Sequence, residues 1–186
     1  MTSAHDFEAV LVAARGGEEW ALAELYRALY PRMVRYVRAV EPIEAEDVAS
    51  DAWLEVARGL ARFRGDEAGL RAFSFTIARR RLLDIRRQRA RRRTEPRDHR
   101  GLMQAAPIGN VEEEALSSLG TDWAIRLITR SLSSEQADVI LLRVVGDLEV
   151  EAVAKIVGKR PGTVRVLQHR ALRRLARVLE REGVTR

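Results

Sequence analysis

The chain has 186 residues, of which 46% are hydrophobic and none is cysteine. This hydrophobic content excludes a disordered protein, and the missing cysteine excludes disulfides, thiolate metal sites and cysteine nucleophiles. The 33 basic residues exceed the 27 acidic ones and give a formal net charge of +6, as in proteins that meet nucleic acid or acidic membranes. Neither a signal-peptide pattern nor an apolar run of about 20 residues is present. We therefore expect a cytoplasmic protein without cofactor or metal.

The first half of the sequence predicts a series of helices. Apolar residues at helical spacing form a first helix that ends at Gly16-Gly17. Residues 20–29 predict a second helix, and Pro31 is expected to begin a third, because proline fits the first turn of a helix. Residues 41–63 predict another helix. Residues 70–93 predict a long helix that changes from amphipathic to almost wholly basic.

Residues 94–117 interrupt this pattern with proline, glycine and a glutamate triplet, and we predict a flexible linker there. Helical periodicity then returns, with Thr121 as the expected N-cap of the next helix. Ser133 and Gln136 have the spacing of a capping box. Strand-like alternation of any length is absent from the sequence. The prediction is an all-α protein of two small helical domains, residues 1–93 and 118–186.

The segment around Gly158 has the pattern of a DNA-binding helix-turn-helix. Gly158 can adopt the left-handed conformation that ends a helix, and Pro161 suits the first turn of the next. The apolar residues expected to face the core of this motif are Val150, Val153, Ala154, Val157, Val164, Leu167 and Leu172. The pattern and the local positive charge together favour duplex DNA over a merely solvated basic hairpin.

The polar residues left over in this segment are the candidates for contact with the DNA major groove. Arginine can bind guanine and glutamine can bind adenine through paired hydrogen bonds, whereas lysine and threonine suit phosphates. The candidates are Lys159, Arg160, Thr163, Arg165, Gln168, His169 and Arg170.

The helix predicted at residues 41–63 carries carboxylates at successive spacings of three and four residues, which places them on one flank: Glu44, Asp47, Asp51 and Glu55. Val48 lies on the adjoining inner stripe. No histidine, serine or lysine is spaced to make these carboxylates an acid–base pair or a metal site. Taken alone, such a stripe is usually a solvated face.

The helix predicted at residues 70–93 begins with Phe73 and Phe75 and continues into the arginine run "IARRRLLDIRRQRARRR". Aromatic rings beside arginines suit single-stranded nucleic acid, because bases stack on the rings while cations follow the backbone. For either phenylalanine alone, a place in the core is the more common alternative. For the arginine run, contact with nucleic acid is favoured.

Four segments, in this order, resemble the extracytoplasmic-function (ECF) sigma factors of bacterial RNA polymerase, group IV of the sigma-70 family: "LYRALYPRMVRYVR", "AEDVASDAWLEV", "FRGDEAGLRAFSFTIARRRLLDIRR" and "LLRVVGDLEVEAVAKIVGKRPGTVRVLQHRALRRL". The resemblance covers residues 20–93 and 118–181. It implies an alternative sigma factor that binds core RNA polymerase, directs promoter-specific initiation and catalyses nothing itself. The two domains would be sigma regions 2 and 4.

The resemblance also implies a partner for each surface. The clamp helices of the polymerase β′ subunit would receive Glu44, Asp47, Val48, Asp51 and Glu55. The −10 element would be recognised and melted by Arg64, Asp66, Glu67, Phe73, Thr76, Arg79 and Arg80. The −35 element would be read by the helix-turn-helix candidates, in a domain that rests on the β flap. The linker would pass the active-site cleft, and an anti-sigma factor would hold the protein inactive.

The sequence departs from the family pattern at three places. Phe73 replaces a frequent tryptophan and keeps an aromatic ring, and Ser50-Asp51 replace a frequent Gln-Glu pair and keep a negative charge. Arg80 stands where an asparagine is frequent near the flipped base, so the −10 sequence that this chain reads stays open.

Two other functions fit parts of the sequence. A free-standing regulator would bind duplex DNA tightly without polymerase and would use its first half to sense or dimerise, and the acidic helix argues against it. A nucleic-acid enzyme is disfavoured, because the chain has three histidines, no cysteine, no phosphate-cradling glycine loop and no base facing its carboxylates.

Overall fold

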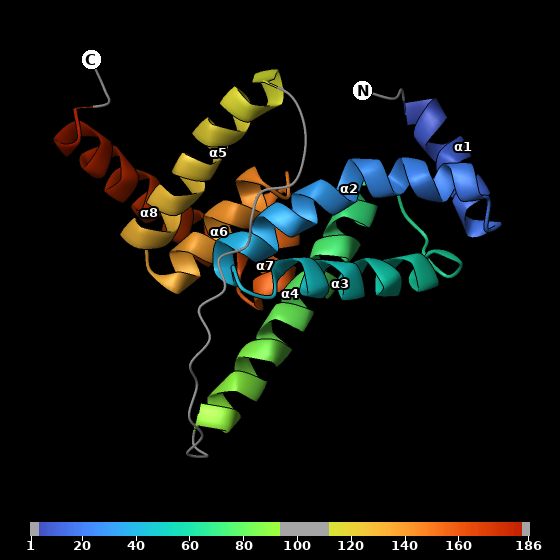
Figure 1. Ribbon diagram of the computed structural model, residues 1–186, viewed down its shortest axis with the longest axis horizontal. Helices are drawn as coiled ribbons and strands as arrows, with labels where there is room; N and C mark the ends of the chain where they lie inside the picture. Colours follow the sequence, from blue (N-terminus) through green and yellow to red (C-terminus); the bar gives the residue numbers. More distant parts are fainter. Residues whose placement is uncertain (1–3, 94–111, 184–186) are drawn as a thin grey trace.

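A computed structural model describes residues 4–93 and 112–183 of the chain. Within these ranges the fold is all-α, as predicted, and its helices are α1 (Ala4–Arg15), α2 (Glu19–Val40), α3 (Ala45–Leu60), α4 (Glu67–Arg93), α5 (Glu112–Ser131), α6 (Ser134–Val144), α7 (Val150–Val157) and α8 (Pro161–Arg181) (Figure 1). Residues 94–111 of the predicted linker lie outside the described residues, and residues 112–117 already belong to α5. Thr121 is inside α5 and is not an N-cap.

The N-terminal domain consists of α1 to α4. Helix α2 packs against α1, α3 and α4, and α3 packs against α4. The inner faces of these helices repeat every three or four residues, so that Leu29 and Met33 of α2 and Val48 and Val56 of α3 share one core. The core therefore fixes the rotation of α3, which decides the side chains that this helix presents to solvent.

Pro31 does not begin a helix, contrary to the sequence prediction, and lies inside the continuous helix α2. A proline there removes one backbone hydrogen bond and displaces the carbonyl four residues earlier, that of Arg27. Both Pro31 and Arg27 are exposed, so water can bond to the freed carbonyl. The buried residues Leu29 and Met33 flank the proline and anchor both halves of the helix in the core.

The C-terminal domain consists of α5 to α8. Helix α6 begins with the predicted capping box, in which the Ser133 side chain accepts from the Gln136 backbone and the Gln136 side chain accepts from the Ser133 backbone. Gly158 ends α7 with a φ of 68°, which confirms the expected left-handed turn. Val164 is buried in α8, but Leu172 is 50% exposed and does not face the core as predicted. Ala171 occupies that inner position instead.

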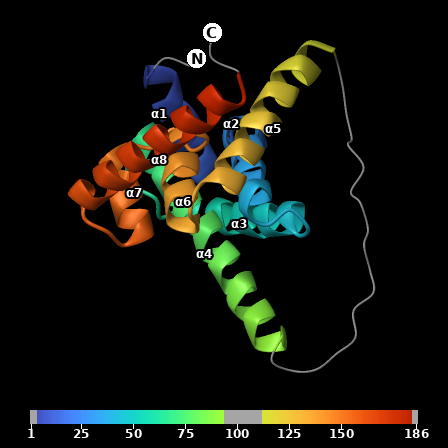
Figure 2. The same cartoon turned by 90° about the vertical axis from the view of Figure 1, so that its left-hand side faces the viewer.

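The two domains lie against each other. Helix α4 contacts α7, while α2 contacts α5 and α6. The arginine-rich end of α4 projects away from the rest of the molecule in both views (Figures 1 and 2). Among the helices that the structure describes, none is both long and apolar enough to cross a bilayer.

Candidate protein and nucleic-acid interfaces

The exposed face of α3 carries two free carboxylates one helical turn apart. Asp47 and Asp51 are both exposed, and neither has an ion-pair or hydrogen-bond partner among residues 4–93 and 112–183. Leu54 continues the same face one turn further and is 50% exposed. The sequence prediction missed Leu54, although its position three residues after Asp51 placed it on this flank. We call Asp47, Asp51 and Leu54 the α3 face.

The other residues predicted for this surface have different roles. Val48 is 1% exposed and belongs to the core, so it holds α3 in place and is not available to a partner. Glu44 pairs with Arg89 of α4 at 3.0 Å. Glu55 pairs with Arg80 and, at 2.9 Å, with Arg81. These two glutamates therefore join α3 to α4.

Aromatic residues fix α3 against α2 beside this surface. The rings of Tyr26 and Tyr30 stack with centroids 4.4 Å apart, and Trp53 meets Tyr26 edge-on at 5.3 Å. The hydroxyl oxygens of Tyr30 and Ser50 are 2.9 Å apart, within hydrogen-bonding distance. Desolvation and the nearby Tyr30 raise the pKa of Tyr26. This packing restrains the direction in which Asp47 and Asp51 point.

A pocket of about 580 Å³ opens between α3 and α4. Three of the predicted −10 residues line it, namely Phe73, Thr76 and Arg80. Glu55, which was predicted for the clamp surface, also lines it. The sequence prediction missed the rest of this wall at the end of α3 and just after it, namely Arg58, Gly59, Ala61 and Arg62. Basic residues at spacings of four after the acidic stripe were the signal for that wall. The pocket thus combines an aromatic ring with several cations.

Phe73 and Phe75 differ in how deeply they are buried. Phe75 is fully buried and packs edge-on against Tyr36 with ring centroids 5.6 Å apart, so it is a core residue. Phe73 is half-buried and lies 5.5 Å from the ring of Phe63. Gly59 makes room for it, because a Cβ there would lie 2.7 Å from Phe73 Cζ. Phe73, unlike Phe75, therefore presents part of its ring to the pocket.

Three other predicted −10 residues shape the turn before α4. The Asp66 carboxylate accepts a hydrogen bond of 2.7 Å from the Gly69 backbone and so caps α4. Glu67 pairs with Arg71 at 2.6 Å. Arg64 donates to the Phe63 carbonyl at 2.8 Å. None of these three side chains belongs to the pocket lining.

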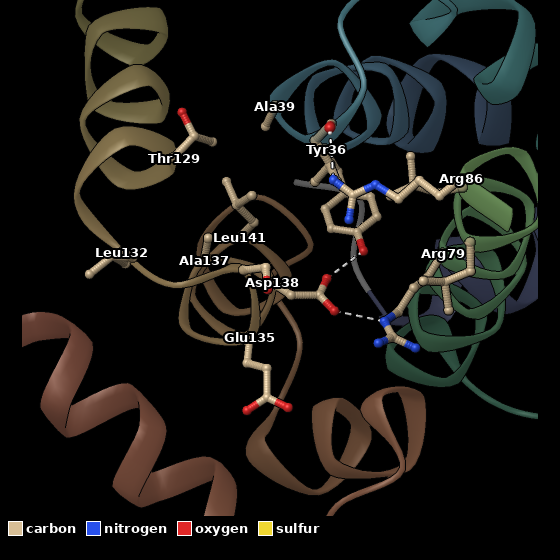
Figure 3. A pocket seen from close by; sticks show the side chains of 14 residues that line it. Tyr36, Ala39, Arg79, Arg86, Thr129, Leu132, Glu135, Ala137, Asp138 and Leu141 are labelled. Carbon is tan, nitrogen blue, oxygen red and sulfur yellow. Dashed lines mark hydrogen bonds and ion pairs between the residues drawn. The ribbon is translucent and has the colours of Figure 1, made fainter. Parts of the chain in front are cut away.

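Arg79, the remaining −10 candidate, points toward the C-terminal domain. Its Nε donates to Asp138 of α6 at 2.8 Å, and its Nη1 donates to the carbonyl of Ile156 in α7 at 3.1 Å. The other carboxylate oxygen of Asp138 accepts a 2.7 Å bond from the buried hydroxyl of Tyr36. Figure 3 shows these three side chains converging from three helices. Burial and then the Asp138 charge raise the pKa of Tyr36 well above its ordinary range.

The DNA-contact candidates of the helix-turn-helix differ in how far they are exposed. Thr163, His169 and Arg170 are exposed on α8, and Arg160 is exposed directly before it, as expected. Gln168 is only half-exposed, because it stands four residues after buried Val164 and three before buried Ala171, on the inner side of the helix. Exposed Val166 lies three residues after Thr163 on the outer side and was missed, since an apolar residue in this pattern reads as core.

Two basic candidates of this motif are paired with carboxylates of the same domain. Arg165 meets Glu151 of α7 at 2.6 Å, and Lys159 meets Glu135 of α6 at 3.0 Å. Both carboxylates are more than half exposed, so these pairs contribute little to stability. Both basic side chains can therefore exchange these partners at small cost.

Comparisons with known proteins agree with this architecture. The family model for Sigma-70 region 2 matches residues 25–92, and the model for Sigma-70, region 4, matches residues 122–175. SigD of Mycobacterium tuberculosis (strain ATCC 25618 / H37Rv), an ECF RNA polymerase sigma factor, is 34% identical over 176 residues, which are 90% of this chain and 81% of SigD. The ECF sigma factor ShbA of Streptomyces griseus is 31% identical over 173 residues, 88% of this chain and 90% of ShbA.

Two solved structures share the fold. CnrH in complex with the cytosolic domain of CnrY has a TM-score of 0.62 at 17% identity and covers 94% of this chain and 97% of its own. RpoE in complex with the anti-sigma factor NepR from Bartonella quintana has a TM-score of 0.62 at 20% identity and covers 88% of this chain and 98% of its own. From the family models and the sequence relatives together, the chain belongs to the ECF RNA polymerase sigma factors. It is a transcription initiation factor.

Proposed function

We propose that the α3 face docks this sigma factor on the clamp helices of the polymerase β′ subunit. The observation that carries the proposal is the pair of free carboxylates, Asp47 and Asp51, on a helix whose other acidic residues are engaged within the chain. Complementary charge steers association and selects partners. Leu54 adds an exposed apolar group beside the carboxylates, as in interfaces with an apolar centre and a charged rim.

We propose that the pocket between α3 and α4 receives an unstacked base of the −10 element. Its ring, Phe73, offers a stacking surface, and stacking contributes about 1–3 kcal/mol per base. Arg58 and Arg62 bring positive charge for the adjoining phosphates. Arg80 pairs with Glu55 at the pocket, so the base meets an Arg–Glu pair where the family frequently has asparagine. In this account Asp66 and Glu67 act by shaping the turn that leads to the pocket.

We propose that the outer side of α8 reads the −35 element. Arg160, Thr163, Arg165 and Arg170 follow its exposed side, and Arg165 is the candidate for a paired contact with guanine. Val166 lies among them and can pack on a thymine methyl group. Gln168 is assigned to the inner side and supports the helix position.

We propose that an anti-sigma factor regulates this chain and that the C-terminal domain rests on the β flap. The anti-sigma proposal is supported by the RpoE structure of the same fold, which was solved with the anti-sigma factor NepR. The flap proposal is supported by Val144 at the end of α6, which is 69% exposed.

Promoter-specific transcription tests the docking proposal. Core polymerase would be supplied with wild-type protein or with the Asp47→Arg, Asp51→Arg variant on a fragmented genomic library, and transcript starts would be sequenced. We expect new starts that share −35 and −10 motifs with the wild type. The double variant should lose at least about 100-fold of this activity, because opposing like charges cost several kcal/mol in an interface.

The matched control is Glu8→Arg, Glu24→Arg, which makes the same change in net charge at exposed positions of α1 and α2. We expect this variant to retain the new starts. Equal loss in the two variants would show an effect of net charge and would contradict docking through the α3 face.

A further inference from the structure

The contact between the two domains centres on a buried polar cluster. Asp138 of α6 accepts from Tyr36 of α2 through one carboxylate oxygen and from Arg79 of α4 through the other, at 2.7 and 2.8 Å (Figure 3). The Arg79 and Asp138 side chains are only 21% and 19% exposed. Both oxygens of one carboxylate from the C-terminal domain are thus bound by two helices of the N-terminal domain.

An apolar contact lies beside this cluster. Leu82 of α4, Leu132 just after α5 and Leu141 of α6 are buried there, and they line a pocket of about 390 Å³ that opens between the domains. The only other ion pair between the domains in the described residues, Arg32 with Asp147, spans 3.8 Å and is well exposed, so it adds little. The Asp138 cluster is therefore the mostly buried charged contact that joins the domains, beside this apolar contact.

The closed arrangement conflicts with reading a promoter, given the function proposed above. The −10 and −35 elements lie about 25 base pairs apart, or roughly 80 Å at about 3.4 Å per base pair. In the closed chain Arg79 Nη1 lies 3.1 Å from the Ile156 carbonyl. The helix that lines the −10 pocket therefore touches the first helix of the helix-turn-helix, and the two readers cannot reach both elements at once.

We propose that Asp138 is an autoinhibitory latch, which occupies Arg79 with a carboxylate in the place of a DNA phosphate and keeps the two domains closed. Opening releases Arg79, whose guanidinium binds carboxylate and phosphate in the same geometry. The closed form thus withholds a cation from the −10 strand and holds the −35 reader out of position. The Asp138 side chain takes part in both effects.

Distance measurement in the free protein tests the latch. The chain has no cysteine, so Ala28→Cys and Ala176→Cys, at exposed positions of α2 and α8, can be spin-labelled specifically. We expect one narrow distance distribution for the otherwise wild-type chain. Asp138→Ala, and more weakly Asp138→Asn, should broaden and lengthen it, because asparagine keeps an acceptor for Tyr36 but loses the charge that holds Arg79.

The matched control is Glu24→Gln, which removes one negative charge from an exposed pair with Arg27 and should leave the distribution unchanged. Single-stranded DNA (dT12) supplies a second readout by fluorescence anisotropy. Asp138→Asn should bind it several-fold more tightly than Glu24→Gln, and adding Arg79→Ala should remove the gain. Circular dichroism establishes that each variant keeps its helices.

A distribution in the wild type as broad as that of Asp138→Ala would overturn the latch, and so would equal DNA affinity of Asp138→Asn and Glu24→Gln. Neither measurement uses polymerase or a promoter. A narrow distribution in a protein that initiates no transcription would therefore contradict the proposed function and leave the latch standing.

Discussion

The acidic and the basic surfaces of this protein differ in what their charges already contact. On the α3 face, Asp47 and Asp51 have no partner among the described residues. On the candidate DNA surfaces, in contrast, some arginines are paired within the chain, as Arg79 is with Asp138 and Arg165 with Glu151, whereas Arg160 and Arg170 are exposed. The exposed pair of Arg165 is weak and exchanges readily, but the mostly buried pair of Arg79 joins two domains. We therefore expect the domains to separate before Arg79 contacts DNA.

The inner and outer sides of α8 give the largest expected contrast. Arg165→Ala should lower transcription from a −35-dependent promoter about 5- to 150-fold, since a paired base contact is worth about 1–3 kcal/mol. Gln168→Ala should change it less than about 3-fold, because Gln168 stands on the inner side of the helix with Val164 and Ala171. The measurement is run-off transcription on one mapped promoter. A larger loss with Gln168→Ala than with Arg165→Ala would contradict the orientation assigned to α8.

Gly59→Ala is expected to change the shape of the −10 pocket with little loss of stability. Alanine is favoured over glycine in a helix by about 1 kcal/mol, but its Cβ would lie 2.7 Å from Phe73 Cζ and must displace that ring. We expect unfolding by denaturant to show little loss of stability, while open-complex formation, followed by permanganate reactivity, falls about 10-fold. Unchanged melting of the promoter would show that Phe73 is not the stacking ring. Gly16→Ala is the control, since a Cβ there lies after α1, away from the pocket, and meets only backbone oxygens of α1.

The smallest expected effect is a change in stability with pH, and it concerns Tyr36, whose hydroxyl binds Asp138 at the contact between the domains. Its pKa is raised above the ordinary 10.0 by burial and then by Asp138, while Arg79 and Arg86 act in the opposite direction. Below pH 10 the tyrosine is neutral in both states and its contribution to stability is complete. As pH rises further, the unfolded chain loses this proton first, so stability falls by up to about 1.4 kcal/mol per pH unit until the folded pKa is reached. Urea unfolding from pH 9 to 11 should show a steeper loss for the wild type than for Tyr36→Phe, and equal slopes would contradict this assignment.

Local features of the fold were predictable because they depend on nearby residues. The capping box at Ser133, the glycine turn at Gly158 and the buried face of α7 follow from side-chain spacing alone. Pro31 was misread because the packing of Leu29 and Met33 outweighs the propensity of one residue for a helix start. Leu172 was misread because a one-residue error in the phase of α8 moves a side chain from one side to another.

The residues of the candidate site were likewise predictable only where their roles depend on local spacing. The α3 stripe could be listed from helical spacing, but only tertiary contacts distinguish Asp47 and Asp51 from Glu44 and Glu55, whose partners lie on α4. The orientation of Arg79 could not be predicted at all, because Asp138 stands 59 residues away in the sequence. Residue roles and domain boundaries assigned from the family pattern stay predictions for the experiments above.

The most direct test of the central claim follows the two domains as the protein binds polymerase. The chain labelled at Ala28→Cys and Ala176→Cys would be measured alone and with saturating core polymerase, beside the same labels in the Asp47→Arg, Asp51→Arg variant. We predict that core polymerase lengthens the distance in the wild type and leaves the variant unchanged. An unchanged distance in a complex active in transcription would contradict the claim that the domains separate on polymerase.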